Sequence, residues 1–382
     1  MTDLPLKGLV VLEFSQYLSG PSAGLRLADL GARVIKIERP STGDAGRKLA
    51  IKNLWVDDNS LLFHTINRNK ESFTADLKDT NDLELVKKLI VKADVLIHNF
   101  RPGVMQKTGL DYESVKQINP CLIYAEISGY GKEGPWRNKP GQDLLLQSMT
   151  GLAYTTGNGV NGPVPFGVAI ADILSGAQLV QGILAALIRR QKKGIGALIE
   201  VSLAESLLDF QFELLTTYYT SNQQPKRSYN SNGHPLISAP YGIYKTSDGY
   251  IALAMMDISA LAKAIECPAL EAYSNERAFA DRDEIKAILA GYLSFEKTNH
   301  WLPRLRQQGL WAMDVFDWEK MMEHEAYQVL QMEQTLNVGG KKIVTTRCPI
   351  RIDGQRLLSD KPAPRLGEHN EKVMREMVSG EW

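Results

Sequence analysis

The chain has 382 residues, too many for one ordinary hydrophobic core, so the sequence predicts two domains. Apolar residues make up 44% and charged residues 23%, which is typical of a soluble globular protein. Because 44 Lys and Arg balance 44 Asp and Glu, the chain lacks the basic excess of most nucleic-acid-binding proteins, and its zero net charge favours self-association.

The amino-terminal part begins with a strand, a helix and a strand. Residues 8–14, GLVVLEF, are continuously β-prone, residues 22–30 have helical spacing that stops at Gly31, and residues 32–38, ARVIKIE, are β-prone again. This order within so short a length is typical of a βαβ unit.

The same alternation continues downstream. Residues 82–93 have the spacing of an amphipathic helix, and residues 94–100, DVLIHNF, and 121–128, CLIYAEIS, are β-prone. The sequence therefore predicts an α/β domain with a largely parallel sheet over about the first 130 residues.

The middle of the chain contains a long apolar helix. Residues 172–190 are apolar almost all round, which predicts a helix buried inside a domain or against a partner. The basic residues and glycines of KKGIG end it. Residues 197–203 are predicted to be a strand, and residues 204–221 one long helix.

The composition changes after this helix. Residues 222–240 are polar and rich in Asn, Ser and Pro, as in a linker or binding loop. A β-hairpin with Asp248-Gly249 at its turn is predicted over 241–255, and helices over roughly 258–330. Strands at 343–354 and a helix at 366–380 close the chain.

No classical metal, disulfide or membrane signal is present. Cys121, Cys267 and Cys348 are too widely spaced for a disulfide framework or a CxxC metal site, and none of the six histidines forms a close pair. The apolar stretches stop short of the roughly 20 residues that a membrane helix needs. The start of the chain lacks the pattern of a signal peptide, so we expect a cytoplasmic protein that binds neither metal, membrane nor nucleic acid.

One apparent dinucleotide-binding motif is excluded by the residues that follow it. Residues 129–134 match GxGxxG after a strand, but Pro135 and the polar residues that follow do not open a helix, as a dinucleotide-binding motif requires. We interpret this segment as a flexible glycine-rich loop, which is either structural or closes over a ligand.

Two aspartates stand at predicted helix starts. Asp143, in PGQDLLLQ, is explained by a helix N-cap alone. Asp172 follows the apolar run VPFGVAIA and begins the long apolar helix, so it is either an N-cap or a nucleophile. The free N–H groups and positive potential of a helix N-terminus would keep such a carboxylate ionised, and an ionised carboxylate can attack an acyl carbon.

Several cations of the first domain lie at loop positions. Arg39 follows the second predicted strand and Arg101 follows HNF, while Lys78 and Lys107 also lie outside the strands. Ligands bind to α/β folds at the rim that such loops form, so these residues are candidates to bind a polyanion, although ordinary surface charge explains any single one.

Eight segments, in order from end to end of the chain, resemble the class III CoA-transferase family, which includes formyl-CoA transferase, carnitine CoA-transferase and the α-methylacyl-CoA racemases. They are LKGLVVLEFSQYLSGP, LGARVIKIERP followed by GD, NRNKESFTADLK, ADVLIHNFRPGVMQKTGLDY, INPCLIYAEISGYGKEGP, GVAIADILSGAQLVQGILAAL, GIGALIEVSLAES and LGEHN. Residues 245–335 match the family in shape more than in residues.

The resemblance implies a Rossmann-like large domain built from both termini, a smaller α+β domain, and an interlocked homodimer. In this chain the large CoA-binding domain would begin with residues 1–200, a linker helix and loop would take 201–240, the small domain 241–325, and the return to the large domain 326–382.

The resemblance also assigns residues to roles. It implies that Asp172 is the nucleophile and that coenzyme A is the substrate carrier. The family's CoA-contacting positions fall on Leu18, Ser19, Arg39, Ala75, Lys78, Asn99, Phe100, Arg101, Lys107 and Lys139.

Gln142 departs from the racemase pattern. Racemases of the family pair the aspartate with a histidine in a PGHD-like motif, whereas this chain has Pro140-Gly141-Gln142-Asp143. Glutamine cannot carry a proton at neutral pH, so the two-base reaction lacks one base. The GGGGQ-type loop of the formyl-CoA enzyme has no counterpart either, since SNGHPLISAPYG stands in that region, which speaks against oxalate or formate specificity.

The sequence therefore predicts an acyl-CoA:carboxylate CoA-transferase that acts through covalent intermediates on Asp172. Gln142, Asp143 and His234 would contact the substrate or support the site, and Arg101 would help to hold an acceptor carboxylate. Two alternatives remain: an α-substituted acyl-CoA racemase or epimerase with an unrecognised base, and a CoA-binding protein that has lost catalysis.

Overall fold

The computed structural model describes residues 4–380 and divides the chain into two compact units. Unit 1 contains Met1–Leu146, Ala169–Leu207 and Gln331–Trp382, and unit 2 contains Gln147–Val168 and Leu208–Leu330. Residues 1–3, which enter the expectation about a signal peptide, lie outside the described residues.

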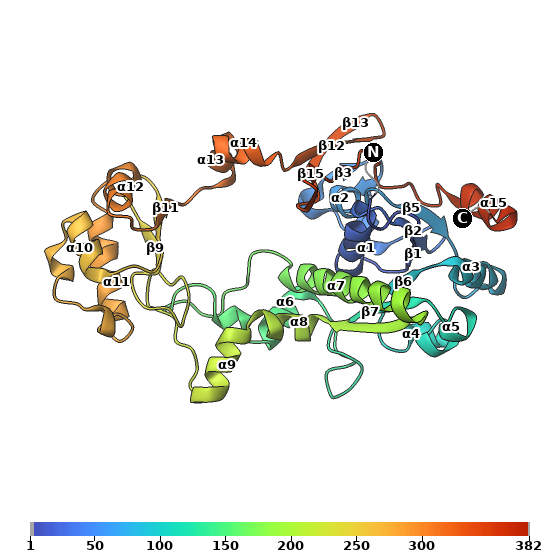
Figure 1. Cartoon of the computed structure of the whole chain (residues 1–382), viewed down its shortest axis with the longest axis horizontal. Helices are drawn as coiled ribbons and strands as arrows, with labels where there is room; N and C mark the ends of the chain where they lie inside the picture. The colour runs from blue at the N-terminus through green and yellow to red at the C-terminus, as the bar shows by residue number, and fades with distance from the viewer. Residues whose placement is uncertain (1–3, 381–382) are drawn as a thin grey trace. The chain divides into compact units, whose positions relative to one another are not determined.

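A six-stranded sheet forms the centre of unit 1 (Figure 1). Its strands run in the order β5 (Glu71–Thr74), β2 (Arg33–Glu38), β1 (Val10–Glu13), β6 (Val95–His98), β7 (Ile123–Ser128) and β8 (Ala197–Ser202). Every neighbouring pair is parallel, which confirms the predicted parallel sheet. Since both faces of such a sheet are covered, most of its strands contain short apolar runs, but the edge strand β5, with the sequence ESFT, does not and was not predicted.

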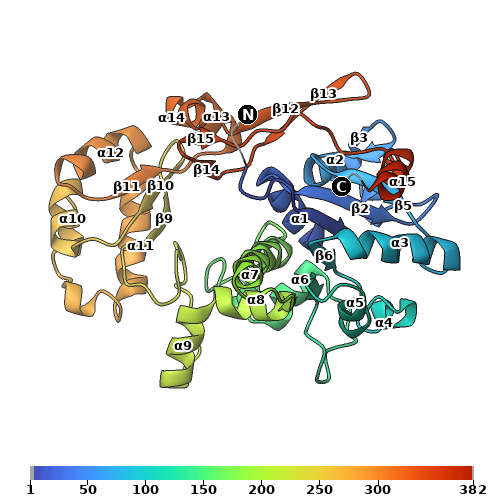
Figure 2. The same cartoon turned by 45° about the vertical axis from the view of Figure 1, so that its right-hand side comes forward.

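Helices cover the two faces of this sheet. Figures 1 and 2 show α1 (Ser19–Asp29) and α7 (Ile170–Lys193) on one face, and α3 (Thr80–Lys92), α4 (Val104–Thr108) and α5 (Tyr112–Ile118) on the other. The second face is packed by apolar side chains of both layers, among them Leu12, Ile35 and Leu96 from the strands and Val86 and Leu89 from α3.

The carboxyl-terminal helix completes unit 1. Helix α15 (Asn370–Ser379) lies beside the edge strand β5, where Asn370 Oδ1 accepts a hydrogen bond from Thr74 N at 2.9 Å and Lys372 pairs with Glu71 at 2.7 Å. Unit 1 is therefore built from both ends of the chain.

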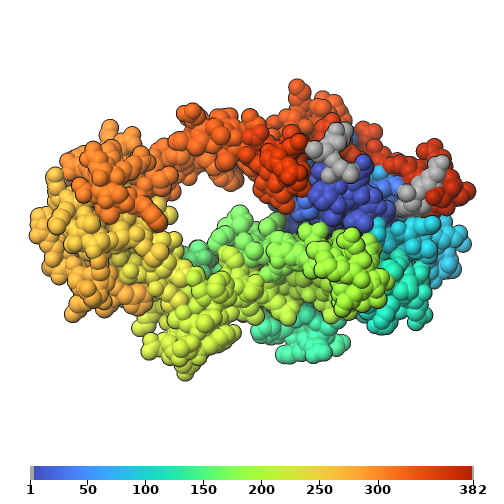
Figure 3. Space-filling view, viewed as in Figure 1, coloured from blue at the N-terminus to red at the C-terminus, as the bar shows by residue number. Residues whose placement is uncertain are grey.

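Helix α7 is less buried than its composition predicts. Ala171, Ser175, Gly176, Leu179 and Ile183 face α1 and the sheet, whereas Ile173 and Ile188 on other sides are 47% and 57% exposed. Figure 3 shows atoms of α7, in green, at the surface of unit 1. By length and composition α7 could also cross a membrane, but core helices of soluble proteins pass the same test.

Unit 2 has an antiparallel sheet packed against helices. Strands β9 (Gly242–Lys245) and β10 (Tyr250–Leu253) form the predicted hairpin, and β11 (Ala312–Asp314) pairs with β10. Helices α10 (Ile258–Ile265), α11 (Arg282–Leu293) and α12 (Thr298–Gln307) cover its apolar core. The prediction of helices throughout residues 258–330 is wrong at β11. A strand of three residues is too short to show the alternation of apolar and polar residues that marks a strand.

The predicted long helix at 204–221 is two helices, α8 (Leu203–Phe210) and α9 (Phe212–Ser221). They separate at Gln211, whose backbone leaves the helical region and whose side-chain amide donates to Thr150 O at 3.2 Å. Residues 147–168, which fall within the predicted large domain, belong to unit 2. Gln147 closes this segment, since its Oε1 accepts from Phe166 N at 2.8 Å.

The remaining elements are smaller. They are η1 (Ala45–Lys48), η2 (Ile51–Asn53), β3 (Trp55–Val56), β4 (Asn59–Ser60), α2 (Leu61–Asn67), α6 (Asp143–Met149), η3 (Leu152–Tyr154), η4 (Pro268–Leu270), η5 (Asn275–Arg277), α13 (Trp318–Glu323), α14 (Glu325–Leu330), β12 (Glu333–Val338), β13 (Lys341–Thr346), β14 (Arg351–Ile352) and β15 (Gln355–Arg356).

Candidate active site

Three segments meet at the carboxyl edge of the parallel sheet: the loop after β1, the residue after β6 and the N-terminus of α7. Asn99 joins the first two, since its Oδ1 accepts from Gln16 N at 2.8 Å and its Nδ2 donates to Gln16 O at 2.7 Å and to Ser19 Oγ at 3.2 Å. Two residues that the family resemblance assigns to CoA binding, Ser19 and Asn99, are thus in direct contact.

Ser19 connects this loop to Asp172. The Ser19 side chain lies close enough to the Asp172 carboxylate to favour its ionised form, and because Asn99 Nδ2 donates to Ser19 Oγ, the Ser19 hydroxyl proton is free to point at the carboxylate. Close packing of α1 on α7 produces this contact. A Cβ built at Gly176 would lie 2.3 Å from Ser22 Oγ and 2.7 Å from Ser19 O, so the two helices can approach this closely only at glycine.

Asp143 caps the helix that carries Asp172. Its Oδ1 accepts from Ala171 N at 2.6 Å and from Asp172 N at 3.3 Å. The N-cap interpretation is therefore wrong for Asp172, whereas Asp143 does cap a helix, although a different one from the helix that the sequence indicated. Asp143 is the first residue of α6, where Gln142 O accepts from Leu145 N and Leu146 N, and Asp172 is the third residue of α7, whose N-cap position is Ala169.

The surroundings raise the pKa of Asp172 to about 6. Burial is the largest cause, the negative charge of Asp143 adds to it, and the hydrogen bond with Ser19 opposes it. The sequence predicts that free N–H groups at this helix N-terminus favour the ionised carboxylate, but Asp143 occupies two of these groups. With a pKa of about 6 the carboxylate is still mostly ionised at neutral pH, as a nucleophile requires.

Gln142 immediately precedes the capping residue. Its side chain is exposed, and no titratable group stands at this position, where a racemase of the family would carry its histidine. The glycine-rich segment 129–134 does not open a helix, as expected from Pro135. The loop returns on itself at Gly129 and Gly141, since a Cβ at Gly129 would lie 2.9 Å from Gly141 Cα.

The cations predicted to bind CoA are exposed and unneutralised. Within residues 4–380, no ion pair is found for Arg39, Lys78, Arg101, Lys107 and Lys139, all of which are exposed. Arg39 and Arg101 follow β2 and β6, so they share the carboxyl edge of the sheet with Ser19. Such cations are available to bind phosphate groups.

The other three predicted CoA positions are apolar. Leu18 is the N-cap residue of α1 and is half-buried, while Ala75 directly follows β5, where its N–H donates to Glu38 O at 2.9 Å. The ring of Phe100 lies nearly parallel to that of His98, with the centroids 6.0 Å apart. Side chains of Leu, Ala and Phe carry no hydrogen-bonding group, so they would act through shape and apolar surface.

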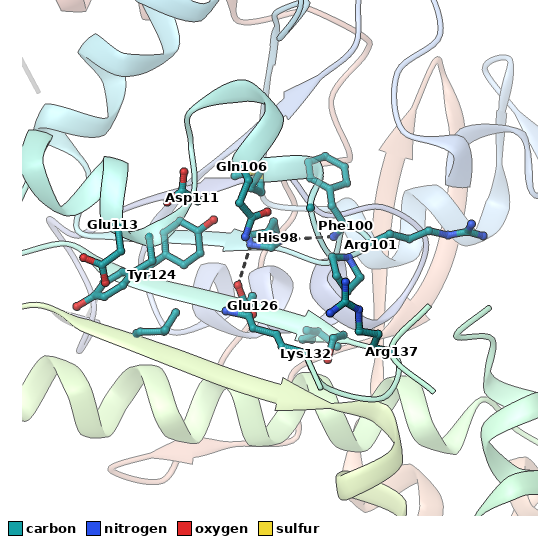
Figure 4. A pocket seen from close by; sticks show the side chains of 17 residues that line it. His98, Phe100, Arg101, Gln106, Asp111, Glu113, Tyr124, Glu126, Lys132 and Arg137 are labelled. Carbon is teal, nitrogen blue, oxygen red and sulfur yellow. Dashed lines mark hydrogen bonds and ion pairs between the residues drawn. The ribbon is translucent and has the colours of Figure 1, made fainter. Parts of the chain in front are cut away.

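A cavity of about 450 Å³ opens beside Arg101 (Figure 4). Its walls include the rings of His98, Phe100 and Tyr124, and the cations Arg101, Lys132 and Arg137 line it together. Arg137 was missed by the sequence reasoning. Its only signal is its place in the basic stretch Arg137-Asn138-Lys139 that leads to Gln142.

His98 is buried and lies between a backbone N–H and a carboxylate. Its Nδ1 accepts from Phe100 N at 3.3 Å, which assigns the ring proton to Nε2, 3.4 Å from Glu126 Oε2. Lys132 pairs with Glu126 at 2.8 Å and with Glu200 at 2.9 Å, and so ties the glycine-rich loop to the sheet.

His234 lies in unit 2, where its Nε2 is 2.9 Å from Glu213 Oε1. The structure therefore gives this histidine a carboxylate partner within its own unit. Across residues 4–380, no group of three or more His, Cys, Asp or Glu side chains is arranged to hold a metal ion.

Comparison with known proteins gives one family. The family model described as CoA-transferase family III matches residues 6–370. A succinate–glutarate CoA-transferase of Agrobacterium fabrum is 33% identical, with 99% of this chain and 98% of that protein aligned. An acetyl-CoA:oxalate CoA-transferase of Acetobacter aceti is also 33% identical, over 99% and 97%.

Solved structures agree with these matches. The crystal structure of a CAIB/BAIF family protein from Brucella suis has a TM-score of 0.85 at 32% identity and covers 98% of this chain and 100% of that one. The structure of Rv3272 from Mycobacterium tuberculosis has a TM-score of 0.83 at 29% identity, over 97% and 99%.

Proposed function

The chain belongs to family III of the CoA-transferases and is a CoA-transferase, and from this premise we propose that it moves CoA between an acyl-CoA and a carboxylic acid through covalent intermediates on Asp172. The observation that carries the proposal is the setting of Asp172. This carboxylate is held by Ser19, lies beside Asp143 and has a pKa of about 6.

The first half of the reaction releases the donor acid. The Asp172 carboxylate attacks the thioester carbonyl, the carbon–sulfur bond breaks, and an aspartyl–acyl anhydride and CoA thiolate form. The thiolate then attacks the Asp172 carbonyl carbon, which expels the donor as a carboxylate and leaves an aspartyl-CoA thioester.

The second half repeats these steps in reverse with the acceptor. The acceptor carboxylate attacks the aspartyl thioester and releases the thiolate, which then attacks the acceptor's carbonyl in the new anhydride. The products are the new acyl-CoA and free Asp172 carboxylate. No proton is transferred, which fits a site that has Gln142 in place of a second base.

The exposed cations are proposed to bind the phosphates of CoA. Arg39, Lys78, Arg101, Lys107 and Lys139 are supported by their lack of ion-pair partners among the described residues, and Arg137 by its place beside Arg101 in the same cavity. Arg137→Gln is expected to raise the KM for the acyl-CoA about 10-fold with kcat unchanged, the loss of one charged contact. The matched control is Lys92→Gln, at the far end of α3.

Dicarboxylic acids are the proposed substrate class. Succinate, glutarate and oxalate appear in the names of the two relatives, and all three acids carry two carboxylates. We further propose a homodimer in the cytoplasm, with the exposed apolar residues of α7 supporting a second subunit. Light scattering coupled to size exclusion tests the dimer.

The decisive experiment follows CoA exchange between a panel of acyl-CoAs and isotopically labelled mono- and dicarboxylic acids. Wild-type protein should exchange at least one pair, and Asp172→Ala should lose at least about 10⁴-fold in rate. Substantial exchange by that variant would refute the role of Asp172. Incorporation of deuterium at the α-carbon without any acceptor acid would show a racemase, and CoA binding without any adduct would show a non-catalytic protein.

A further inference from the structure

The loop between β1 and α1 rests on charges that are fully removed from water. Glu13, Lys36 and Lys70 are 0% exposed and Asp44 is 2% exposed. Burying charges is costly, and a buried ion pair is by itself weak evidence of stabilisation. These charges also hydrogen-bond to backbone atoms of the loop between β1 and α1, and these bonds fix the position of the loop.

Each end of the loop is held by a lysine. Lys36 Nζ donates to Ser15 O at 2.7 Å and to Glu13 Oε1 at 2.8 Å. Lys70 Nζ donates to Pro21 O at 2.8 Å and to Glu13 Oε2 at 2.7 Å. One carboxylate thus joins the two lysines that fix the start and the end of the segment carrying Ser19.

Asp44 holds the middle of the loop. Its Oδ2 is 2.8 Å from Lys36 Nζ, and its Oδ1 accepts from Tyr17 N at 3.1 Å and from Gly46 N at 2.8 Å. Tyr17 has φ of 65°, a left-handed conformation that a tyrosine rarely adopts. Such conformations persist where the surroundings over-determine them, and they cluster at functional sites.

We propose that Asp44 is a positioning residue of the transfer reaction: with Lys36 it holds Tyr17 in the left-handed conformation and thereby sets Ser19 against Asp172. The chain of contacts runs from Asp44 to Tyr17 N, two residues along the loop to Ser19, and from Ser19 to the carboxylate. The proposal deepens the proposed function, because it assumes that Asp172 is the reacting group.

The test compares Asp44 with another buried aspartate. Asp29, 6% exposed, pairs with Arg26 and Arg68 at the other end of α1, so Asp29→Asn and Asp29→Ala also break buried ion pairs without touching the loop. Asp44→Asn keeps an oxygen for Tyr17 N but loses the charge that faces Lys36, and Asp44→Ala loses both. If Asp44→Ala does not fold, Asp44→Asn carries the same comparison with a smaller effect.

The first readout needs no activity. The pKa of the Asp172 carboxyl is measured by carbon NMR titration. Asp143, the charged group beside it, is unchanged in every variant, so its effect on this pKa cancels in the comparison. Asp44→Ala should raise this pKa by about half to one unit, the equivalent of the lost hydrogen bond from Ser19, and Asp29→Ala should leave it unchanged. An unchanged pKa in folded Asp44 variants, or an equal rise in the Asp29 variants, overturns the proposal.

The second readout is the single-turnover rate of adduct formation with succinyl-CoA as the probe. Asp44→Ala should lower this rate about 100-fold, the cost expected for a misplaced reacting group, with little change in the KM for the acyl-CoA. An equal loss in Asp29→Ala would contradict the proposal. If wild-type protein forms no adduct with any acyl-CoA, the proposed function fails while the NMR titration still decides the role of Asp44.

A rescue variant separates conformation from general damage. Asparagine tolerates the left-handed region, so Tyr17→Asn should recover part of the activity lost by Asp44→Ala when the two are combined. If the two losses simply multiply, Asp44 does not act through the conformation of Tyr17.

Discussion

The interior of unit 2 consists of apolar side chains, whereas the carboxyl edge of the sheet in unit 1 contains buried charged side chains. Between its sheet and helices, unit 2 is filled with fully buried apolar residues such as Leu261, Leu289 and Leu305. In unit 1 the loop that carries Ser19 lies on the buried charges of Glu13, Lys36 and Lys70.

This difference reflects what each interior must hold. Apolar packing fixes whole elements against one another but exerts little directional control over a loop backbone. Charged hydrogen bonds are directional and strong, and they can fix single carbonyl and N–H groups. Unit 1, which carries the candidate nucleophile, therefore has directional interactions beside the loop that must place Ser19 against this nucleophile.

The largest effect is expected from Asp172→Asn, which should abolish transfer and also stabilise the protein. The pKa of Asp172 is raised from 3.8 to about 6 on folding, so the folded state binds this proton more tightly, and the wild type loses stability as the pH rises from 3.8 through 6. Asparagine does not titrate, so the variant should gain about 3 kcal/mol relative to the wild type above pH 6.

Urea unfolding of both proteins at acidic and neutral pH measures this gain. A variant that is no more stable at pH 7 than the wild type would show that burial of Asp172 costs nothing.

The matched change in the apolar interior is Leu289→Ala in α11. Leu289 is fully buried, so its truncation should cost about 2 to 5 kcal/mol at every pH, with no region of gain. Hydrogen exchange of the β10 amides reports this loss within unit 2. A pH-dependent loss would contradict the contrast between the two interiors.

Gly176→Ala tests the packing that brings Ser19 to Asp172. The new methyl group would meet Ser19 O and Ser22 Oγ, so α1 and α7 must separate, at a cost of about 1 to 3 kcal/mol together with a loss of kcat. The control is Gly182→Ala on the same helix, where the nearest atom to the new methyl group is Ile199 Cγ2, at 2.6 Å, a side-chain methyl group and not backbone of another helix. Since both changes improve helix propensity equally, equal stabilities in thermal unfolding would rule out the proposed role of Gly176.

The smallest effect is a shift of the pH profile in Asp143→Asn. Asparagine can still accept a hydrogen bond from Ala171 N, but it removes the negative charge that helps to raise the pKa of Asp172. The single-turnover rate rises as Asp172 ionises, with a midpoint near pH 6 in the wild type. In the variant this midpoint should move about one unit lower, and a midpoint that stays or rises would mean that Asp143 acts only as a cap.

Much of the fold could be predicted because its signals are local. Most of the parallel strands appear as short apolar runs, although β5 does not, and the hairpin of unit 2 is marked by Asp248-Gly249. The break at Gln211 and the strand β11 could not be predicted, because each depends on contacts with distant residues or on too few residues to show a period. Asp172 could be singled out by its apolar surroundings and its family position. Asp44 lies in a family-matching segment but carries no sign of its role there, and Arg137 has no comparable signal.

The sequence by itself determined the order of strands and helices, the family and the candidate nucleophile, because periodicity and short motifs are written in neighbouring residues. Only the tertiary structure decided that Asp143 caps the helix of Asp172, that Ser19 lies beside this carboxylate, and that Lys36 and Asp44 hold the loop between them. These contacts join residues far apart in the chain, and a carboxylate's pKa depends on burial and neighbouring charge, which no stretch of sequence contains.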